Sequence, residues 1–528
     1  MIRAWIRQCP LRLVGAPKKQ GLTPRSLISF GDGVMDRNAM VGRRWFSSYG
    51  SAVPPTMHID EFNEVYTGLR PGERRMDVPV VLCGRLLSKP REASRKLFFG
   101  SMCGDLGSKV QILSSLSHWD DDSDFTELHR SLVKGDRVTV FGSPGKSKKG
   151  ELSIVATRVI NSAKCNRDIP SGRGDGKYAL KEAKAGPRCQ YFLANPDALQ
   201  IIKARADVVK WIRNYLDENR YVEVETPMLG SRGGATAAPF YTQEGQFLRI
   251  APELKLKEAI VSGFDRVYEL GKVFRNEGKG STRHQIEFTM LEYYTAWSSY
   301  TESMAFVEQM LAGVFRDVAG KTLATPFRRI DIIPALAEKY NMKREDFPDV
   351  NDAENTDQVA EALLGLIGDS HGWNAGSGAG NNTVASNCKL LDILVSRDLE
   401  PLCQEPTFLI NHPIAISPLA KQSKVKGIAE RFELVMNGME LANGYSELND
   451  PEEQRQRLVS QTLGRADSST EVDDDEVMLV DEQYIEVLQY GLPPTAGVGI
   501  GIDRLLMNLT SKAGKERPSI KDVILFPH

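Results

Sequence analysis

Three glutamates recur every seven residues, at Glu433, Glu440 and Glu447. On a helix, acids at this spacing form one solvated face. The dipeptide Asn437-Gly438 between them, however, is a strong signal for a two-residue hairpin turn. With the turn there, Val435 pairs with Glu440, and Glu433 becomes a diagonal neighbour of Glu440 on the same side of the hairpin.

Crowded carboxylates repel one another and require a cation. Oxygen ligands favour Mg²⁺, which commonly also binds the phosphates of a substrate. A regular hairpin would turn Glu447 to the opposite face, so we predict a β-bulge at Asn443-Gly444 that restores it. The residues alone leave two interpretations open: a magnesium site at Glu433 and Glu440, or a solvated acidic face.

A second candidate site surrounds Arg275, in the segment Phe274-Arg275-Asn276-Glu277, which a loop with basic residues follows. A fixed guanidinium can bridge two anions that must approach each other, such as a carboxylate and the phosphate that it attacks. A mobile basic loop can then clamp the leaving group. Taken alone, an arginine in this setting more often forms a surface ion pair.

A third segment has glycines at alternate positions, Gly497, Gly499 and Gly501, followed by Asp503-Arg504. Such spacing lets a ligand or another backbone approach a strand closely. We predict a strand that enters a helix with Arg504 at its start. A glycine-rich core strand is the alternative. A dinucleotide-binding fingerprint is excluded, because the spacing is GxGxG and that fingerprint is GxGxxG.

In this order, the segments around Arg275 and Arg504 resemble motifs 2 and 3 of the class II aminoacyl-tRNA synthetases. The resemblance is closest to the lysyl-tRNA synthetases of subclass b, and further matching segments lie at residues 148–154, 249–257, 269–278, 440–450, 491–495 and 520–527. It covers roughly residues 78–528. It implies an α+β protein, in which an N-terminal OB-fold β-barrel precedes a class II synthetase catalytic domain with an antiparallel sheet flanked by helices.

The resemblance also implies a role for each candidate residue. Arg275 and Arg504 would be catalytic, and Mg²⁺ would accompany ATP at Glu433 and Glu440. The other ATP contacts would come from Glu277, His284 and Phe288, besides Arg275, Glu440 and Arg504. Lysine would be bound by Gly234, Glu253, Arg275, Glu292, Tyr294, Asn443, Tyr445 and Glu447. The anticodon of tRNA(Lys) would contact Phe99, Gln111 and Glu151.

The expected activity is that of a lysine–tRNA ligase that works as a homodimer, with Pro227 at the interface. A buried ammonium group must be paired, so Glu447 with Tyr294 favours lysine, whereas an aspartate pocket would need a cation. Two alternatives are an aspartate or asparagine ligase of the same subclass and a catalytically silent tRNA-binding protein.

The length of 528 residues allows two or three domains. Short apolar runs at residues 78–83, 96–102, 110–113, 136–141 and 152–159, with a helical segment at 124–133, favour a small barrel. Residues 196–218 have helical spacing. We therefore predict a transit peptide at 1–46, a lead-in at 47–77, the barrel at 78–165, a linker at 166–190 and the catalytic domain at 191–528.

The net charge of −2 conceals an asymmetry, because residues 1–46 contain nine Lys or Arg and two acids and therefore carry +7. An arginine-rich, acid-poor, amphipathic start is typical of mitochondrial import, so we expect location in the mitochondrial matrix, with the cytoplasm left open. A basic tail that helps to bind tRNA is the alternative. The seven cysteines show no metal-ligand spacing, so we expect reduced thiols of an intracellular protein, no zinc and no organic prosthetic group. No apolar run is long enough to span a membrane.

Overall fold

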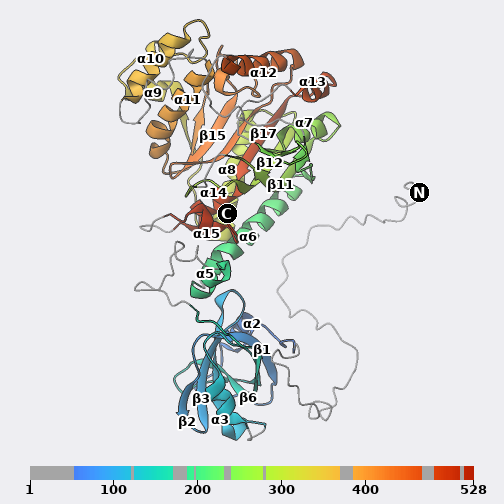
Figure 1. Cartoon of the computed structure of the whole chain (residues 1–528), viewed down its shortest axis with the longest axis vertical. Helices are drawn as coiled ribbons and strands as arrows, with labels where there is room; N and C mark the ends of the chain where they lie inside the picture. Colours follow the sequence, from blue (N-terminus) through green and yellow to red (C-terminus); the bar gives the residue numbers. More distant parts are fainter. Residues whose placement is uncertain are drawn as a thin grey trace, which may run out of the picture. The chain divides into compact units, whose positions relative to one another are not determined.

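The computed structural model describes residues 53–120, 124–169, 187–195, 198–230, 239–276, 281–368, 384–466, 481–511 and 517–527. The predicted transit peptide, Gly234 and Glu277 lie outside these ranges. The chain divides into two compact units (Figure 1). The smaller unit includes Val65–Ser101 and Gln111–Asn166, and the larger unit includes Arg167–His528.

The strands of the smaller unit form a closed barrel of OB type. Strand β1 pairs with β5 at one side and with β3 at the other, which closes the order β1-β5-β6-β4-β3. Alternate residues of β1 are buried, as expected for a strand with one face in a core. The barrel strands are β1 (Val80–Leu86), β3 (Leu97–Cys103), β4 (Lys109–Ser115), β5 (Arg137–Lys146) and β6 (Leu152–Ala163); β2 (Arg91–Ser94) pairs with β3, and α3 (Phe125–Ser131) belongs to the same unit. Most of helix α2 (Ile59–Tyr66) falls in the larger unit, which includes His58–Glu64.

The larger unit is built on an eight-stranded sheet with the order β13-β14-β15-β16-β17-β12-β11-β7. The central strands are antiparallel, as predicted, whereas β13 with β14 and β11 with β7 pair in parallel at the two edges. The strands are β7 (Val222–Glu223), β11 (Arg266–Phe274), β12 (Glu287–Ala296), β13 (Arg328–Asp331), β14 (Thr407–Ile410), β15 (Arg431–Met436), β16 (Met439–Ser446) and β17 (Thr495–Gly501). A small separate sheet contains β8 (Leu229–Gly230), β9 (Phe240–Tyr241) and β10 (Phe247–Leu248).

One face of this sheet is covered by a continuous core that includes Ile212, Val314 and Leu506. These residues come from α6 (Ala198–Glu218), α8 (Tyr300–Ala319) and α14 (Ile502–Thr510). Helix α8 begins at a capping box formed by Ser299 and Glu302, and it ends at Gly320 in the left-handed conformation. Short helices α5 (Arg188–Ala194) and α15 (Ile520–Val523) also belong to this unit.

The opposite face carries two separate hydrophobic clusters, one near each edge of the sheet. The first lies beneath α9 (Ile332–Lys339), α10 (Thr356–Ile367) and α11 (Val384–Leu394), and the second beneath α7 (Glu253–Val261), α12 (Pro451–Ala466) and α13 (Glu482–Gln489). Figure 1 shows these two groups of helices toward the two edges of the sheet. Parts of β16, β17 and β12 therefore lie between the two clusters on this face.

The predicted hairpin is present, with Met436 opposite Met439 and Val435 opposite Glu440. The predicted position of the bulge was wrong. The register shifts between Leu434 and Val435, which leaves Leu441 as the extra residue. Gly444 instead continues the regular ladder opposite Phe432. Close packing explains the glycine, since a Cβ there would lie 2.7 Å from the Phe432 ring and 2.8 Å from Val498. The earlier bulge has the expected effect, since Asn443, Tyr445 and Glu447 share the side of Glu433.

Among the described residues, no helix combines the length and the apolar character needed to cross a membrane. The described cysteines are all free thiols.

Candidate active site

The strand register places the candidate residues in two rows across the uncovered face. In the first row, Asn443 lies opposite Glu433 on one side and Gly499 on the other, and Gly499 lies opposite Glu292. In the second row, Tyr445 lies opposite Arg431 on one side and Gly497 on the other, and Gly497 lies opposite Tyr294. Directly opposed residues share a face of the sheet. Side chains from positions 292–445 of the chain therefore surround one pocket.

The floor of this pocket is the glycine stripe, Gly497, Gly499 and Gly501 of β17. The cavity has a volume of about 450 Å³, within the range of about 300–1,000 Å³ typical of small-molecule sites. A Cβ on Gly497 would lie 2.3 Å from Cε1 of Tyr294, whereas a Cβ on Gly499 would meet nothing closer than 3.6 Å. Gly499 thus gives a ligand close access to the strand, as the spacing predicts, whereas Gly497 makes room for the packed side chains of Tyr294 and Glu447.

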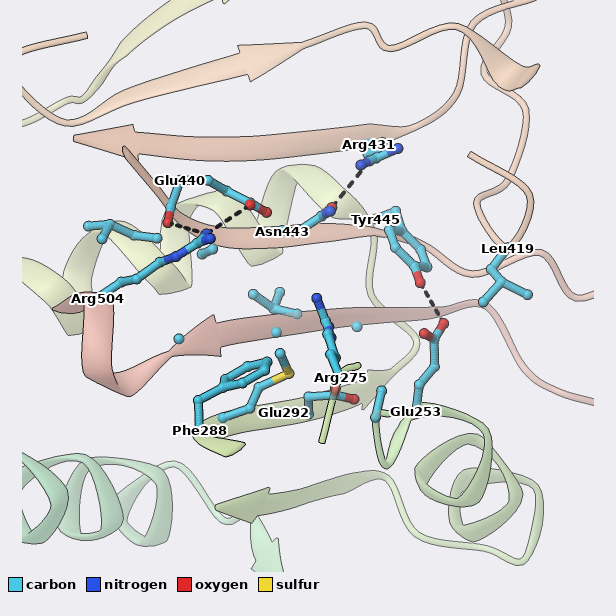
Figure 2. Close-up of a pocket in the computed structure, with 18 of the residues that line it drawn as sticks. Glu253, Arg275, Phe288, Glu292, Leu419, Arg431, Glu440, Asn443, Tyr445 and Arg504 are labelled. Atoms are coloured by element: carbon cyan, nitrogen blue, oxygen red, sulfur yellow. Dashed lines mark hydrogen bonds and ion pairs between the residues drawn. The ribbon is translucent and has the colours of Figure 1, made fainter. Parts of the chain in front are cut away.

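Arg275 lies in the middle of the pocket, between two chemically different ends (Figure 2). Its Cζ atom is 5.2 Å from the centroid of the Phe288 ring. Its Nε is buried and has no hydrogen-bond partner among the described residues. A buried donor without a partner is costly, so the guanidinium is well prepared to bind an anion that enters the pocket.

At one end of the pocket, Arg504 and Glu440 form an ion pair across 3.1 Å. Arg504 also donates to Nε2 of His284, at 3.0 Å. The neighbouring residue Asp503 is buried; it accepts a hydrogen bond from the Thr289 backbone at 2.8 Å and pairs with Arg205 of α6. These contacts fix the start of α14, and they aim Arg504 at the pocket.

Glu433 and Glu440 differ in environment. Burial acts to raise the pKa of Glu433, but Arg431, at 2.6 Å, and then His412 outweigh it and hold the pKa at about 2. Burial and the charge of Glu433 raise the pKa of Glu440, and Arg504 opposes them. Only Glu440 of this pair lines the pocket.

These two carboxylates fit Mg²⁺ in the manner typical of nucleotide sites, where one or two carboxylates bind the ion together with substrate phosphates. The carboxylate oxygens of the partly exposed Glu440 and of the ionised Glu433 beside it meet that requirement. In the part of the chain that the structure describes, no group of three or more His, Cys, Asp or Glu side chains could hold a metal. A metal here therefore depends on the substrate for its remaining ligands.

The other end of the pocket is acidic. Tyr445 donates to Glu253 at 2.5 Å, and Tyr294 donates to Glu292 at 3.3 Å. Glu447 is fully buried beside them. Burial, helped by the charge of Glu253, raises the pKa of Glu292 and of Glu447 to about 8 in each case, although Arg275 opposes the shift at Glu292 and Lys257 opposes it at Glu447.

Lys257 is a functional candidate that the sequence analysis missed. Its ammonium lies 2.7 Å from Glu253 and 2.5 Å from Glu447, and its side chain is completely buried. The four-residue spacing between Glu253 and Lys257 on α7 is a signal for an ion pair. That spacing alone does not distinguish a buried pair from a surface pair.

The structure brings most predicted ligand-binding residues together. Arg275, His284, Phe288, Glu253, Glu292, Tyr294, Glu440, Asn443, Tyr445 and Arg504 all line this one pocket, and Glu447 is buried beside Gly497 on the same face of the sheet. Gly234 and Glu277 are outside the described residues. The predicted anticodon contacts lie in the barrel, where Gln111 donates to Glu151 at 2.6 Å and the Arg91 guanidinium lies 5.4 Å from the Phe99 ring centroid.

Comparison with known proteins agrees with this geometry. The family described as tRNA synthetases class II (D, K and N) matches residues 184–528. The chain belongs to this family. The matched residues contain the catalytic sheet and its helices, and the OB-type barrel precedes them in this α+β chain.

Several class II synthetases of known activity are similar to the chain over most of its length. The lysine–tRNA ligase of Shouchella clausii is 37% identical over 470 residues, which cover 85% of this chain and 86% of that relative. Lysine–tRNA ligase cla4 of Cladosporium cladosporioides is 37% identical over 501 residues, with coverage of 89% and 79%. The lysine–tRNA ligase of Xanthomonas oryzae pv. oryzae is 39% identical over 412 residues, with coverage of 75% and 76%.

Proposed function

We propose that this class II synthetase is a lysine–tRNA ligase. It activates L-lysine with ATP to lysyl-adenylate, releases pyrophosphate, and transfers lysine to the 3′ end of tRNA(Lys). The observation that carries the proposal is the acidic end of the pocket: Glu253 lies on the side of Arg275 away from Arg504, and Glu292 lies next to Arg275 (Figure 2). Glu447 contacts the same Lys257 ammonium as Glu253. The names of the similar relatives support the same substrate.

The position of Arg275 suits the activation step. The lysine carboxylate attacks the α-phosphate of ATP, and the two anions repel each other. A guanidinium between them offsets this repulsion and aligns the reacting atoms. Phe288 offers its ring to the adenine, and Arg504 binds the nucleotide from the opposite side. None of these steps needs a side chain to act as a general base.

Mg²⁺, held by Glu440 and Glu433, would neutralise phosphate charge when ATP is bound. Glu447 and Tyr294 bind the side-chain ammonium of lysine, and Glu253 binds its α-amino group. The same site would bind aspartate poorly, because a second carboxylate would face the three glutamates. This charge argument disfavours the aspartate and asparagine ligases of the family.

The remaining elements of the proposal are partners and location. The barrel binds the anticodon of tRNA(Lys) through Phe99, Gln111 and Glu151. The enzyme works as a homodimer, and the exposed side chains of Met228 and Leu229, 47% and 48% accessible, support an interface beside Pro227. The basic segment at residues 1–46 directs it to the mitochondrial matrix.

The test is pyrophosphate exchange into ATP by the full chain, with lysine, aspartate and asparagine supplied separately. We expect exchange with lysine alone. Exchange with aspartate or asparagine would contradict the pocket assignment. A folded protein that binds tRNA(Lys) but exchanges with no amino acid would instead be a silent binding protein.

A further inference from the structure

Lys257 occupies an unusual position for a lysine, because no part of its side chain is exposed. Its ammonium contacts Glu253 and Glu447, and it lies 5.7 Å and 5.6 Å from the ring centroids of Tyr445 and Tyr484. The described structure thus contains a permanent lysine ammonium directly behind the acidic end that the substrate would enter. Figure 2 shows Glu253 and Tyr445 at this end of the pocket.

A buried lysine normally loses its proton, because burial penalises the charged form. Here burial does act to lower the pKa of Lys257, but the charges of Glu253 and Glu447 outweigh it and leave the pKa well above its ordinary value. Lys257 therefore stays charged, and in return its charge opposes the rise in the pKa of Glu447 that burial causes.

The geometry also divides the two oxygens of Glu447 between different tasks. Oε2 lies 2.5 Å from Lys257. That contact is an ion pair, since neither oxygen accepts a hydrogen bond from the described residues, and Oε1 lies 2.4 Å from the position of a Cβ on Gly497, against the pocket floor. One oxygen is thus held from behind, and the other faces the side from which a ligand approaches.

The balance of charge points to the kind of ligand. When ionised, Glu253, Glu292 and Glu447 contribute three negative charges, and Lys257 and Arg275 contribute two positive ones. The site therefore lacks one positive charge, which is the net charge of lysine with both amino groups protonated. Without Lys257 it would lack two, and a buried carboxylate would then take up a proton.

We propose that Lys257 is a specificity-determining positioning residue: its fixed ammonium favours the ionised form of Glu447 when a cationic ligand enters, so that the pocket prefers an amino acid with one net positive charge over its neutral isosteres. The inference rests on the proposed function and extends it to a residue behind the pocket. Lys257 acts through the two carboxylates and does not itself touch the substrate.

The test compares four proteins in amino-acid-dependent pyrophosphate exchange: the unaltered chain, Lys257→Met, Lys257→Arg and Lys255→Met. Lys255 is a matched control on the same helix, because it pairs with Glu258 at 2.8 Å on the partly exposed surface. Each protein is assayed with lysine and with norleucine, which has the same carbon chain without the ammonium. The assays run from about pH 6.5 to about pH 9.

For Lys257→Met we expect the KM for lysine to rise on the order of tenfold to a hundredfold, with a smaller change in kcat, because ground-state binding is weakened. The pH below which kcat/KM falls should rise by about one unit, because the carboxylates lose their stabilising cation. The preference for lysine over norleucine should narrow by roughly tenfold. Lys257→Arg should keep the pH dependence of kcat/KM, and Lys255→Met should match the unaltered chain in all three properties.

A folded Lys257→Met protein with unchanged KM, pH dependence and amino-acid preference would overturn the inference. If circular dichroism shows that this variant is unfolded, Lys257→Gln takes its place, because the neutral amide still donates to the buried carboxylates. The same expected changes and the same overturning result apply to it. An unaltered chain that does not respond to lysine at all would overturn the proposed function, and this inference with it.

Discussion

Glu292 and Glu447 are the residues at which the chemistry of the site is most sensitive to pH. Burial is the main cause that raises the pKa of each to about 8. Both carboxyl groups are therefore partly protonated at neutral pH before a substrate enters. A cation that binds beside them favours the ionised forms and lowers both pKa values.

Lysine binding should consequently release protons at neutral pH. Affinity should rise by at least about tenfold between about pH 6.5 and about pH 8, and it should level off only above about pH 9, where the carboxyl groups become fully ionised. Titration calorimetry in two buffers of different ionisation enthalpy measures this release. Equal heats in both buffers, with an affinity that does not change with pH, would contradict the assigned pKa shifts.

The contrast between Arg275 and Lys257 shows what residue patterns can and cannot predict. Arg275 was predicted because its neighbours and its distance from Arg504 match a family motif. Lys257 was missed because its pairing with Glu253 looks like the surface pair of Lys255 with Glu258 until the fold buries it. Burial depends on the packing of α7 against β12, which residue spacing on one helix does not contain.

Among the elements, β17 has the strictest requirements, because its glycines form the pocket floor while its other residues pack into the core. Val498 and Ile500 are 1% and 0% exposed. The two faces of one strand therefore serve a ligand and the hydrophobic core separately.

Two substitutions in β17 should differ sharply in effect. A methyl group at Gly499 has room, so Gly499→Ala should fold normally but fill the floor and raise the KM for lysine or ATP by at least about tenfold. Gly497→Ala should lower stability by roughly 1–3 kcal/mol, because the methyl collides with Tyr294 and Glu447. Thermal unfolding and exchange kinetics measure both. A destabilised Gly499→Ala with normal KM would refute this account of the floor.

Other elements show why parts of the fold were not predictable. Strand β2 (Arg91–Ser94) was missed because all four residues are exposed and none is a large apolar residue, so no alternation marks it. The bulge was misplaced because glycine in a strand indicates either a bulge or close packing, and at Gly444 the cause is packing against Phe432 and Val498. These choices are made by neighbouring strands that are distant in sequence.

At the scale of the whole molecule, the two units supply different functions. Phe98 is buried in the barrel core, whereas the next residue, Phe99, is only partly buried beside Arg91. Neighbouring aromatic residues on one strand thus face the core and the predicted RNA surface. The larger unit contains all described residues of the amino-acid and nucleotide pocket.

Phe99→Ala should raise the KM for tRNA(Lys) on the order of tenfold to a hundredfold, because a stacked base contributes about 1–3 kcal/mol. Lysine-dependent pyrophosphate exchange should be unchanged, since it needs no tRNA. Aminoacylation and exchange assays separate the two effects. Phe98→Ala is the contrasting variant, and it should destabilise the barrel by about 3–5 kcal/mol. A normal KM for tRNA in Phe99→Ala would contradict the proposed role of this residue.

The place of β17 in the catalytic sheet has a consequence for folding during synthesis of the chain. This strand lies between β12 and β16, although it is the last strand of the chain. During synthesis, the β11–β12 and β15–β16 hairpins each present an open edge until Thr495–Gly501 leaves the ribosome and inserts between them. Open edges invite pairing with other chains. The strand that completes the pocket therefore also ends the period in which the nascent chain is most exposed to aggregation.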